Sequence, residues 1–331
     1  MKDVAQHAGV SVSTVSYVLN ESGPVAPARR ERVMDAVRVL NYTPNSSARS
    51  LKRQSASAIG LVVPDLSNQY FALLTEGVAR AAADADVSVV LCAPEVTGEE
   101  SLNAKLLRSQ RLDGIIYLSS ATISPTKLID LTQLGWVVLV DERMPGFDLP
   151  AVVSDNRRGA RDIARYVLEQ GHRDVAVLAG PNELWTAQQR LAGYREALAG
   201  AGLDPDAVPT VVGDYHESRG YHLAEQLLAG PNPPTALLCA NDLMAVGVLE
   251  YARTHGLSAP QDISVVGFDD VPFASLLTPR LTTVRQPAAE MGRAAADILF
   301  ALIRDDGEEV VVPQFDVELK IRDSVAPPKP R

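Results

Sequence analysis

The chain has 331 residues, of which 46% are hydrophobic and 22% charged, and its net charge is −10. These values are ordinary for a globular protein of two or three domains, and the acidic total by itself argues against nucleic-acid binding. The charge is nevertheless uneven: residues 1–55 carry eight Lys or Arg against four Asp or Glu, a net +4, which leaves −14 for the rest. A basic head on an acidic body indicates a DNA-binding module attached to a domain that stays off the phosphate backbone.

Residues 2–20 are predicted to form two short helices joined by a tight turn at Gly9, with Ser11 capping the second helix. Apolar residues at helical spacing form the inner face: Val4, Ala5, Ala8, Val15, Val18 and Leu19. The rest of the second helix carries mid-sized side chains that can touch base edges, as a helix-turn-helix requires. Our candidate DNA contacts in this segment are Ser11, Val12, Ser13, Thr14, Ser16, Tyr17 and Asn20. The alternative is a small helical hairpin that only packs.

A third helix is predicted over residues 27–40, with Val33, Val37 and Leu40 facing inward. Its arginines form either a solvated surface or phosphate contacts. After Asn45, residues 46–53 can make about two helical turns that are marginal alone in water. Leu51 between cations is what a minor-groove wedge needs, and the alternative is a flexible basic linker. The DNA-contact candidates here are Asn45, Ala48, Arg49, Leu51 and Lys52.

From residue 59 onward, short apolar strands alternate with amphipathic helices, which indicates parallel sheets covered on both faces. The predicted strands are 59–63, 87–92, 114–118, 136–140, 151–153, 174–179, 209–212, 235–239, 263–267 and 281–283. The predicted helices are 69–85, 99–110, 158–170, 188–201, 217–229, 242–255 and 287–304. Two series of strands indicate two doubly wound subdomains, and the cleft between them is the expected small-molecule site. The Pro-rich tail from residue 326 is expected to be disordered.

Several segments together resemble the lac/galactose repressor family of bacterial transcription regulators, over nearly the whole chain. They are DVAQHAGVSVSTVSYVLN, RERVMDAVRVLNYTPNSSARSLK, IGLVVPDLSNQYFALLTEGVARAA, RLDGIIYLSS, RLAGYREAL, CANDLMAVGVLEYARTHGLSAPQDISVVGFDD and LTTVRQPAAEMG. The resemblance implies a helix-turn-helix head over 1–43 and a hinge helix and linker over 44–57. It implies a core over 58–325 similar to periplasmic sugar-binding proteins, with a tail over 326–331. The core divides into an N-subdomain (58–154 and 286–314) and a C-subdomain (155–285 and 315–325).

The resemblance also implies a homodimer whose two heads read a near-palindromic operator, with Leu51 entering the minor groove at a central CG step. Val12, Ser13 and Tyr17 stand where the family reads bases. Tyr17 replaces an arginine that is frequent in the family, so the half-site is expected to differ at that base. Ala26 replaces the usual hydroxyl cap of the third helix, at about 1 kcal/mol of local stability.

Loops after the predicted strands supply candidate effector contacts, because such loops converge at one edge of a sheet. The candidates are Asp65, Tyr70, Phe71, Asp141, Trp185, Thr186, Arg190, Tyr215, Asn241 and Asp269. Trp185 and Thr186 are expected in the loop before helix 188–201 and Arg190 in its first turn, while Asp65 and Asp242 have alternative roles as turn and cap residues. Carboxylates, an amide and an arginine beside aromatic faces suit a neutral sugar, and a purine or nucleoside is the alternative.

The sequence therefore predicts a DNA-binding repressor that is controlled by a small molecule, uses no cofactor or metal, and lies in the cytoplasm. An enzyme is disfavoured because there is no phosphate loop and no strained nucleophile turn. His216 and His222 are six residues apart, not the four that place two zinc ligands on one helix face. A transport binding protein is disfavoured by the basic head and the lack of a signal sequence, and no apolar run is long enough for a membrane span. Cys92 and Cys239 are expected to be buried thiols.

Overall fold

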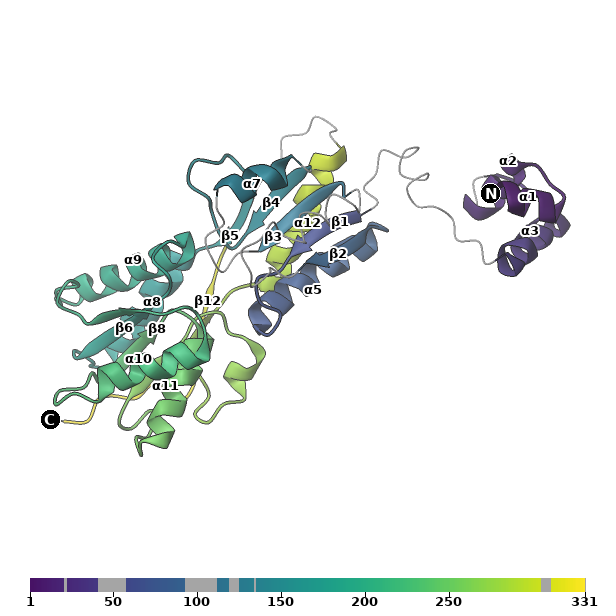
Figure 1. The fold of residues 1–331 in the computed structure, drawn as a ribbon. Helices are drawn as coiled ribbons and strands as arrows, with labels where there is room; N and C mark the ends of the chain where they lie inside the picture. The colour runs from purple at the N-terminus through teal and green to yellow at the C-terminus, as the bar shows by residue number, and fades with distance from the viewer. Residues whose placement is uncertain are drawn as a thin grey trace. The chain divides into compact units, whose positions relative to one another are not determined.

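A computed structural model describes residues 1–20, 23–40, 58–92, 112–118, 125–133, 135–304 and 311–330 (Figure 1). The chain divides into two units, Met1–Ser57 and Ala58–Arg331. The predicted helix 99–110 and the predicted hinge segment 44–57 lie outside the described residues.

The first unit contains three helices, α1 (Lys2–Ala8), α2 (Val12–Asn20) and α3 (Pro27–Val39). Gly9 ends α1 in the left-handed conformation at φ 60°, and the Ser11 hydroxyl caps α2 by accepting from the Thr14 amide at 3.1 Å. Both local predictions are confirmed. The helices enclose a small apolar core of Val4, Ala5, Ala8, Val15, Val18, Val33 and Ala36.

Helix α3 begins at Pro27, as predicted, but ends one residue earlier than predicted. Its N-cap residue is Ala26, which makes no side-chain cap because a methyl group cannot accept a hydrogen bond. Leu40 was expected to face inward, but α3 ends at Val39 and Leu40 is 41% exposed. The helical spacing that would place Leu40 beneath Val33 and Ala36 is lost where the helix stops.

The N-subdomain of the second unit is a six-stranded parallel sheet in the order β11-β5-β4-β3-β1-β2. Its strands are β1 (Ala58–Val62), β2 (Ser88–Cys92), β3 (Gly114–Leu118), β4 (Trp136–Val140), β5 (Ala151–Ser154) and β11 (Gln314–Phe315). Its described helices are α5 (Gln69–Asp84), α7 (Pro125–Thr132) and α12 (Ala288–Arg304). Helices α5 and α12 approach closely at Gly77, where a Cβ would lie 1.9 Å from the Ala289 carbonyl oxygen.

The C-subdomain has a four-stranded parallel sheet in the order β7-β6-β8-β9. Its strands are β6 (Val175–Ala179), β7 (Thr210–Val212), β8 (Ala236–Cys239) and β9 (Ser264–Val266). Its helices are α8 (Asn156–Glu169), α9 (Trp185–Gly200), α10 (Glu217–Leu228) and α11 (Asp242–Thr254), with a 3₁₀ turn η1 (Pro272–Ser275). An antiparallel pair, β10 (Thr283–Arg285) and β12 (Glu318–Lys320), completes it.

The chain passes between the two subdomains three times: from β5 to α8, from β10 to α12, and from β11 to β12. This is the two-subdomain, parallel-sheet core that the alternation of strands and helices predicts. Helix α7 and the short strands β11 and β12 were not predicted. The two strands have only two and three residues, which is too short a pattern to recognise.

The C-terminal tail is the clearest correction to the sequence prediction. Residues 326–330 are ordered against the C-subdomain instead of disordered. The Ala326 carbonyl oxygen lies 2.9 Å from Nε2 of the buried His172 and accepts from the Ser264 hydroxyl at 3.2 Å. Lys329 donates to Asp262 at 2.5 Å. Composition alone could not indicate these partners, which are distant in sequence.

Candidate functional site

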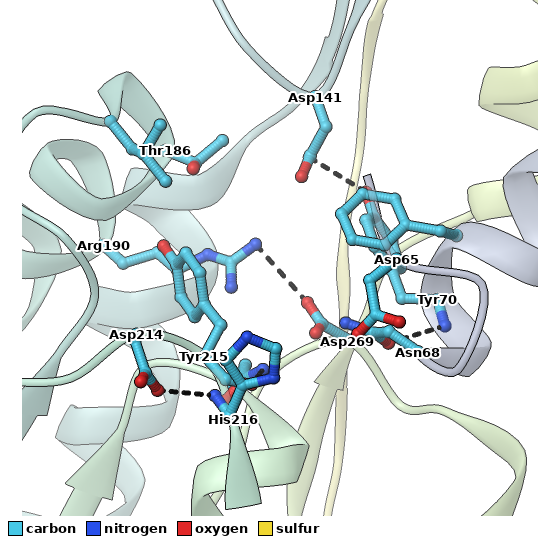
Figure 2. A pocket seen from close by; sticks show the side chains of 13 residues that line it. Asp65, Asn68, Tyr70, Asp141, Thr186, Arg190, Asp214, Tyr215, His216 and Asp269 are labelled. Atoms are coloured by element: carbon cyan, nitrogen blue, oxygen red, sulfur yellow. Dashed lines mark hydrogen bonds and ion pairs between the residues drawn. The ribbon is translucent and has the colours of Figure 1, made fainter. Parts of the chain in front are cut away.

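A pocket lies between the two subdomains, at the carboxyl ends of several of their strands (Figure 2). About 490 Å³ of space not filled by atoms, including open solvent, lies within it. Its lining is Asp65, Asn68, Tyr70, Phe71, Asp141, Leu184, Thr186, Arg190, Asp214, Tyr215, His216, Asn241 and Asp269. All the predicted effector residues except Trp185 are among them.

Arg190 is the only described cation that is buried in this pocket, with 3% of its surface exposed. Its Nε donates to Asn156 Oδ1 at 2.7 Å, its Nη1 to the Ala240 carbonyl at 2.6 Å, and its Nη2 lies 3.4 Å from Asp269 Oδ1. Its guanidinium carbon also sits 4.0 Å from the centroid of the Phe268 ring. Burial would lower the pKa of Arg190, but Asp269 and the other acidic groups outweigh it, so the group stays charged.

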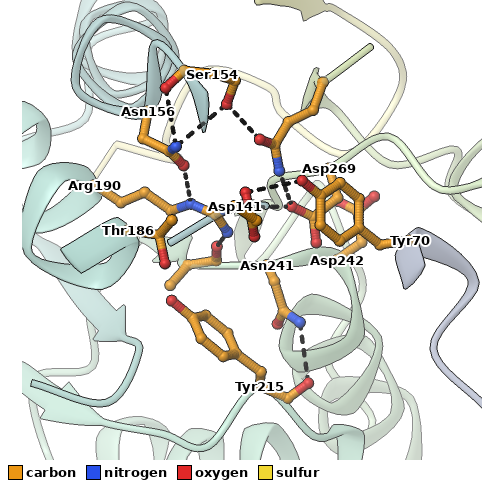
Figure 3. A network of polar contacts seen from close by, with 12 residues as sticks. Tyr70, Asp141, Ser154, Asn156, Thr186, Arg190, Tyr215, Asn241, Asp242 and Asp269 are labelled. Carbon is orange, nitrogen blue, oxygen red and sulfur yellow. Dashed lines mark hydrogen bonds and ion pairs between the residues drawn. The ribbon is translucent and has the colours of Figure 1, made fainter. Parts of the chain in front are cut away.

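A closed series of hydrogen bonds connects Arg190 with Asp269 through the crossover segments (Figure 3). Asn156 joins Arg190 to Ser154, since its Nδ2 donates to the Ser154 carbonyl at 3.1 Å. The Ser154 hydroxyl donates to Gln286 Oε1, and Gln286 Nε2 donates to Asp269 Oδ1 at 2.8 Å. The orientation of the pocket's ion pair is therefore fixed by residues on two of the three chain crossovers.

Asp141 follows β4 and faces Arg190 from the N-subdomain, with 6% of its surface exposed. The Tyr70 hydroxyl donates to its Oδ1 at 2.9 Å. Burial raises the pKa of Asp141 to about 6, although Arg190 and the Tyr70 hydrogen bond act to lower it. Burial likewise raises the pKa of Asp269, partly offset by Arg190.

Four pocket carboxylates share one arrangement, in which Oδ1 is occupied by a donor from the protein. Asp65 accepts from the Ser67 amide at 2.8 Å, Asp214 from the His216 amide at 2.9 Å, and Asp141 and Asp269 from the partners given above. Each of these carboxylates is thereby held in a fixed orientation at the pocket. The pocket thus offers several fixed acceptors to a ligand that carries donors.

Backbone strain is concentrated at this site. Asp141, Tyr215 and Asp269 have φ angles of 68°, 70° and 115°, in the region that side chains rarely adopt. Such conformations persist only where the surrounding structure imposes them, and they gather at ligand sites. The loops after β4, β7 and β9 are therefore built to direct these three side chains inward.

The ring of Tyr215 closes one side of the pocket and depends on Gly180. A Cβ at Gly180 would lie 2.3 Å from the Tyr215 hydroxyl oxygen. That hydroxyl is buried, and no described residue meets hydrogen-bond geometry with it. Burial raises the pKa of Tyr215, and the nearby Thr186 side chain acts to lower it. An unpaired buried hydroxyl beside a pocket is ready to bind a ligand atom.

Asn241 and Asp242 have structural partners at the start of α11. The Asn241 side chain caps α11 by accepting from the Met244 amide at 2.9 Å and donates to the Tyr215 carbonyl at 3.0 Å. Asp242, the alternative cap, instead accepts from the Thr283 hydroxyl at 2.5 Å and the Val271 amide at 2.9 Å. It thereby holds neighbouring loops together beneath the pocket.

Two predictions about α9 are wrong, because the helix starts three residues earlier than the apolar pattern indicates. Trp185 and Thr186 are its first two residues rather than loop residues, and Arg190 lies in its second turn. Trp185 packs under Arg143, whose guanidinium carbon is 5.3 Å from the ring centroid, and does not line the pocket.

Four lining residues were not predicted from the sequence: Asn68, Leu184, Asp214 and His216. Asn68 caps α5 by accepting from the Tyr70 amide at 3.0 Å, a role that an Asn directly before a predicted helix would have indicated. Asp214 and His216 flank Tyr215 at the carboxyl end of β7, where the same rule that selected Tyr215 applies.

The candidate DNA surface of the first unit lies on α2. Val12 and Tyr17 are 43% and 49% exposed, which is unusual for large apolar or aromatic side chains. Ser11 and Ser13 are exposed and Thr14 and Ser16 are half-buried, whereas the Asn20 side chain is outside the described part of the chain. The other predicted contacts, Asn45, Ala48, Arg49, Leu51 and Lys52, lie outside the described residues as well.

No helix in the described part of the chain has the length and apolar character to cross a bilayer, and no cluster of His, Cys, Asp or Glu among those residues is arranged to hold a metal ion. A helix-turn-helix unit joined to a two-subdomain core with a polar cleft defines the class of ligand-controlled DNA-binding regulators.

Comparison with known proteins supports this class. Residues 1–45 match the bacterial regulatory proteins of the lacI family, and residues 164–325 match the periplasmic binding protein-like domain. The chain is 38% identical to the ribose operon repressor of Escherichia coli K12, over 90% of this chain and 91% of the relative. It is 35% identical to the transcriptional repressor CytR of the same organism, over 98% and 95%. The lac repressor dimer bound to operator and the anti-inducer ONPF is structurally similar, with a TM-score of 0.84, 29% identity and 98% coverage of both chains.

The chain belongs to the lacI family of bacterial regulatory proteins. It is a DNA-binding transcriptional repressor under the control of an effector, and it is not an enzyme. The pocket described above is in the position expected for the effector, between the two subdomains of the core.

Proposed function

We propose that the effector is a neutral sugar of about pentose size, with D-ribose as the first ligand to test. The observation that carries this proposal is a set of four carboxylates that line the pocket, each with its Oδ1 held by a donor from the protein. Sugar hydroxyls supply the matching donors, and Arg190 supplies donors to a ring or hydroxyl oxygen. The relative named for the ribose operon supports the same choice.

The same carboxylates disfavour an anionic effector such as a sugar phosphate. Asp65, Asp141, Asp214 and Asp269 face one guanidinium and one imidazole, so the summed charge of the site repels a phosphate. A nucleoside is the second candidate, because the Phe71 and Tyr215 side chains offer apolar faces for a base at the same site.

We further propose that the repressor acts in the cytoplasm as a homodimer. The operator would be a near-palindrome with a central CG step, since two copies of α2 read two half-sites related by the dimer axis. Val12, Ser13 and Tyr17 would contact base edges, and Leu51 would enter the minor groove. Ligand would close the cleft and shift the N-subdomains against each other, and operator and effector would change each other's affinity by the same factor.

Two measurements test this proposal. Purified protein is incubated with sheared genomic DNA of its source at moderate salt, and the retained DNA is sequenced. Enrichment of a short near-palindrome with a central CG supports the DNA-binding part of the proposal, and the absence of enrichment with and without ligands opposes it. Titration calorimetry with D-ribose, ribose 5-phosphate, cytidine and adenosine tests the effector half. Tight binding of ribose 5-phosphate alone would contradict a neutral effector.

A further inference from the structure

Glu142 is a buried carboxylate that the effector site does not use directly. It follows Asp141 after β4 in the N-subdomain, and 3% of its surface is exposed. It is not among the residues that line the pocket. A buried carboxylate next to a ligand site, and not part of that site, needs an explanation, because burying a charge without partners is strongly unfavourable.

The partners of Glu142 all belong to the other subdomain. Its Oε2 accepts from the Trp185 amide at 2.8 Å, and its Oε1 accepts from the Thr186 amide at 3.3 Å and from the Thr186 hydroxyl. These are the first two residues of α9, whose own N-cap residue, Leu184, supplies no side-chain hydrogen bond. The cap of this helix therefore comes from across the cleft, where a carboxylate also meets the positive end of the helix dipole.

Helix α9 carries several of the groups that form the far wall of the pocket. Leu184, directly before the helix, and Thr186 line the pocket, and Arg190 follows Thr186 by four residues on the same face. From this position Arg190 reaches Asp269, with 3.4 Å between Nη2 and Oδ1. Fixing the first turn of α9 against the N-subdomain thus fixes the cation of the effector site.

We propose that Glu142 is a positioning residue for effector binding, which clasps the first turn of α9 across the cleft and so couples closure of the two subdomains to the placement of Arg190. This rests on the proposed function only where a sugar is used as the probe. The clasp itself is a property of the chain without ligand.

The clasp makes effector binding depend on pH. Burial raises the pKa of Glu142 to about 7, and the neighbouring Asp141 adds to the rise, while the hydrogen bonds from Thr186 and Trp185 act against it. Arg143 adjoins Glu142 in sequence, and Tyr215 is close enough to interact with its charge. In an open cleft the carboxyl would regain its ordinary pKa in water, so closure takes up a proton. Closure is then favoured at low pH and weakens as pH rises through 7, by about tenfold between pH 6 and pH 8.

The test compares Glu142→Ala and Glu142→Gln with Glu183→Gln, all in the full chain. Glu183 is exposed and lies two residues before α9, so its substitution makes the same charge change near the same helix end. D-ribose affinity is measured by calorimetry from pH 6 to pH 8, and exchange of the Trp185 and Thr186 amides is measured without ligand.

We expect Glu142→Ala to weaken D-ribose binding at least about tenfold at pH 6 and to speed exchange of both amides, while Glu183→Gln behaves like wild type. Glu142→Gln should make the pH profile less steep, by up to about tenfold between pH 6 and pH 8, and leave the part that is due to Asp141 and Asp269. Wild-type exchange and affinity in Glu142→Ala would overturn the clasp. If the wild type does not bind D-ribose, the sugar assignment fails, and the amide exchange alone decides the role of Glu142.

Discussion

Arg190 of α9 and Asp269 of the loop after β9 form a buried ion pair, with 3.4 Å between Nη2 and Oδ1, in the pocket that we propose for the effector. The pair is held from behind by Asn156 and Gln286, so neither side chain is free to turn away. A buried pair of this kind is a weak source of stability, but breaking it leaves an uncompensated charge. Its geometry therefore serves ligand recognition more than folding.

Replacing Arg190 by lysine is expected to abolish effector binding while the fold persists. A lysine keeps the charge but cannot donate to Asn156, Ala240 and Asp269 at once, because it lacks the planar fork of arginine. We expect at least a hundredfold loss of D-ribose affinity by calorimetry, roughly the loss of two hydrogen bonds to charged groups. Arg195→Lys on the same helix, at a 42% exposed side chain, is the matched control. Equal losses in both variants would show that α9 is merely sensitive to any change.

Asp141→Asn is expected to stabilise the protein at high pH and to weaken effector binding. The pKa of Asp141 is raised by burial from 3.8 to about 6, so its stabilising contribution is present below about pH 4 and is lost as pH rises through 6. A neutral asparagine removes that loss and can still accept from the Tyr70 hydroxyl. The free energy of unfolding should rise by up to about 3 kcal/mol at pH 8 and change little at pH 4.

Urea unfolding at both pH values measures the effect of Asp141→Asn. The exposed Asp148 provides the control, since Asp148→Asn should leave the curve unchanged at either pH. A gain in stability that is equal at pH 4 and pH 8 would mean that the burial of a charge is not its cause.

Gly180→Ala is expected to reduce effector affinity without reducing helix or sheet content. The added methyl group would lie 2.3 Å from the Tyr215 hydroxyl oxygen and 2.4 Å from the ring, so the ring must leave its place in the pocket wall. Gly200→Ala, where nothing lies within 4 Å of the new Cβ, should be neutral or slightly stabilising. Calorimetry with D-ribose and thermal unfolding distinguish the two, and similar affinities in both variants would exclude Tyr215 from the site.

Leu51→Ala should lower specific operator binding much more than non-specific binding, because a minor-groove wedge acts only where a base step can be opened. Lys52→Ala should instead weaken both by a similar factor and reduce the salt dependence, as expected of a phosphate contact. Gel-shift titrations on operator and on unrelated DNA at several salt concentrations provide the comparison. An equal loss on both DNAs for Leu51→Ala would remove the wedge role.

Much of the fold was predictable because its signals are local. The turn at Gly9 and the cap at Ser11 each depend on the backbone preference of one residue. The alternation of strands and helices is likewise visible within a few residues of sequence. The pocket carboxylates were predictable for a topological reason, since loops after parallel strands converge whatever their sequence. The start of α9 was not predictable, because its cap is Glu142, some forty residues away, instead of a residue next to the helix.

The contacts that organise the pocket were also beyond the reach of sequence. Ser154 and Gln286 are 132 positions apart, and nothing in either neighbourhood indicates the other. The same holds for the left-handed conformation of Tyr215 and Asp141, which the fold imposes on residues that do not prefer it. The chemical groups of such a site can be predicted from the sequence, whereas the orientation of their side chains is determined by the tertiary structure.

The series of hydrogen bonds through Asn156, Ser154 and Gln286 ends on Arg190 and Asp269, so an effector bound to that pair would lie next to the chain crossovers of the core. These residues stand where the chain crosses between subdomains, and we expect a rotation of one subdomain against the other to pivot there. In a rigid-body rotation, the displacement of an atom grows in proportion to its distance from the axis, so a small shift at the pocket becomes a larger shift at the far end of each subdomain. A molecule the size of a single sugar can thus govern movements much larger than itself, with no relay of contacts running through the sheets.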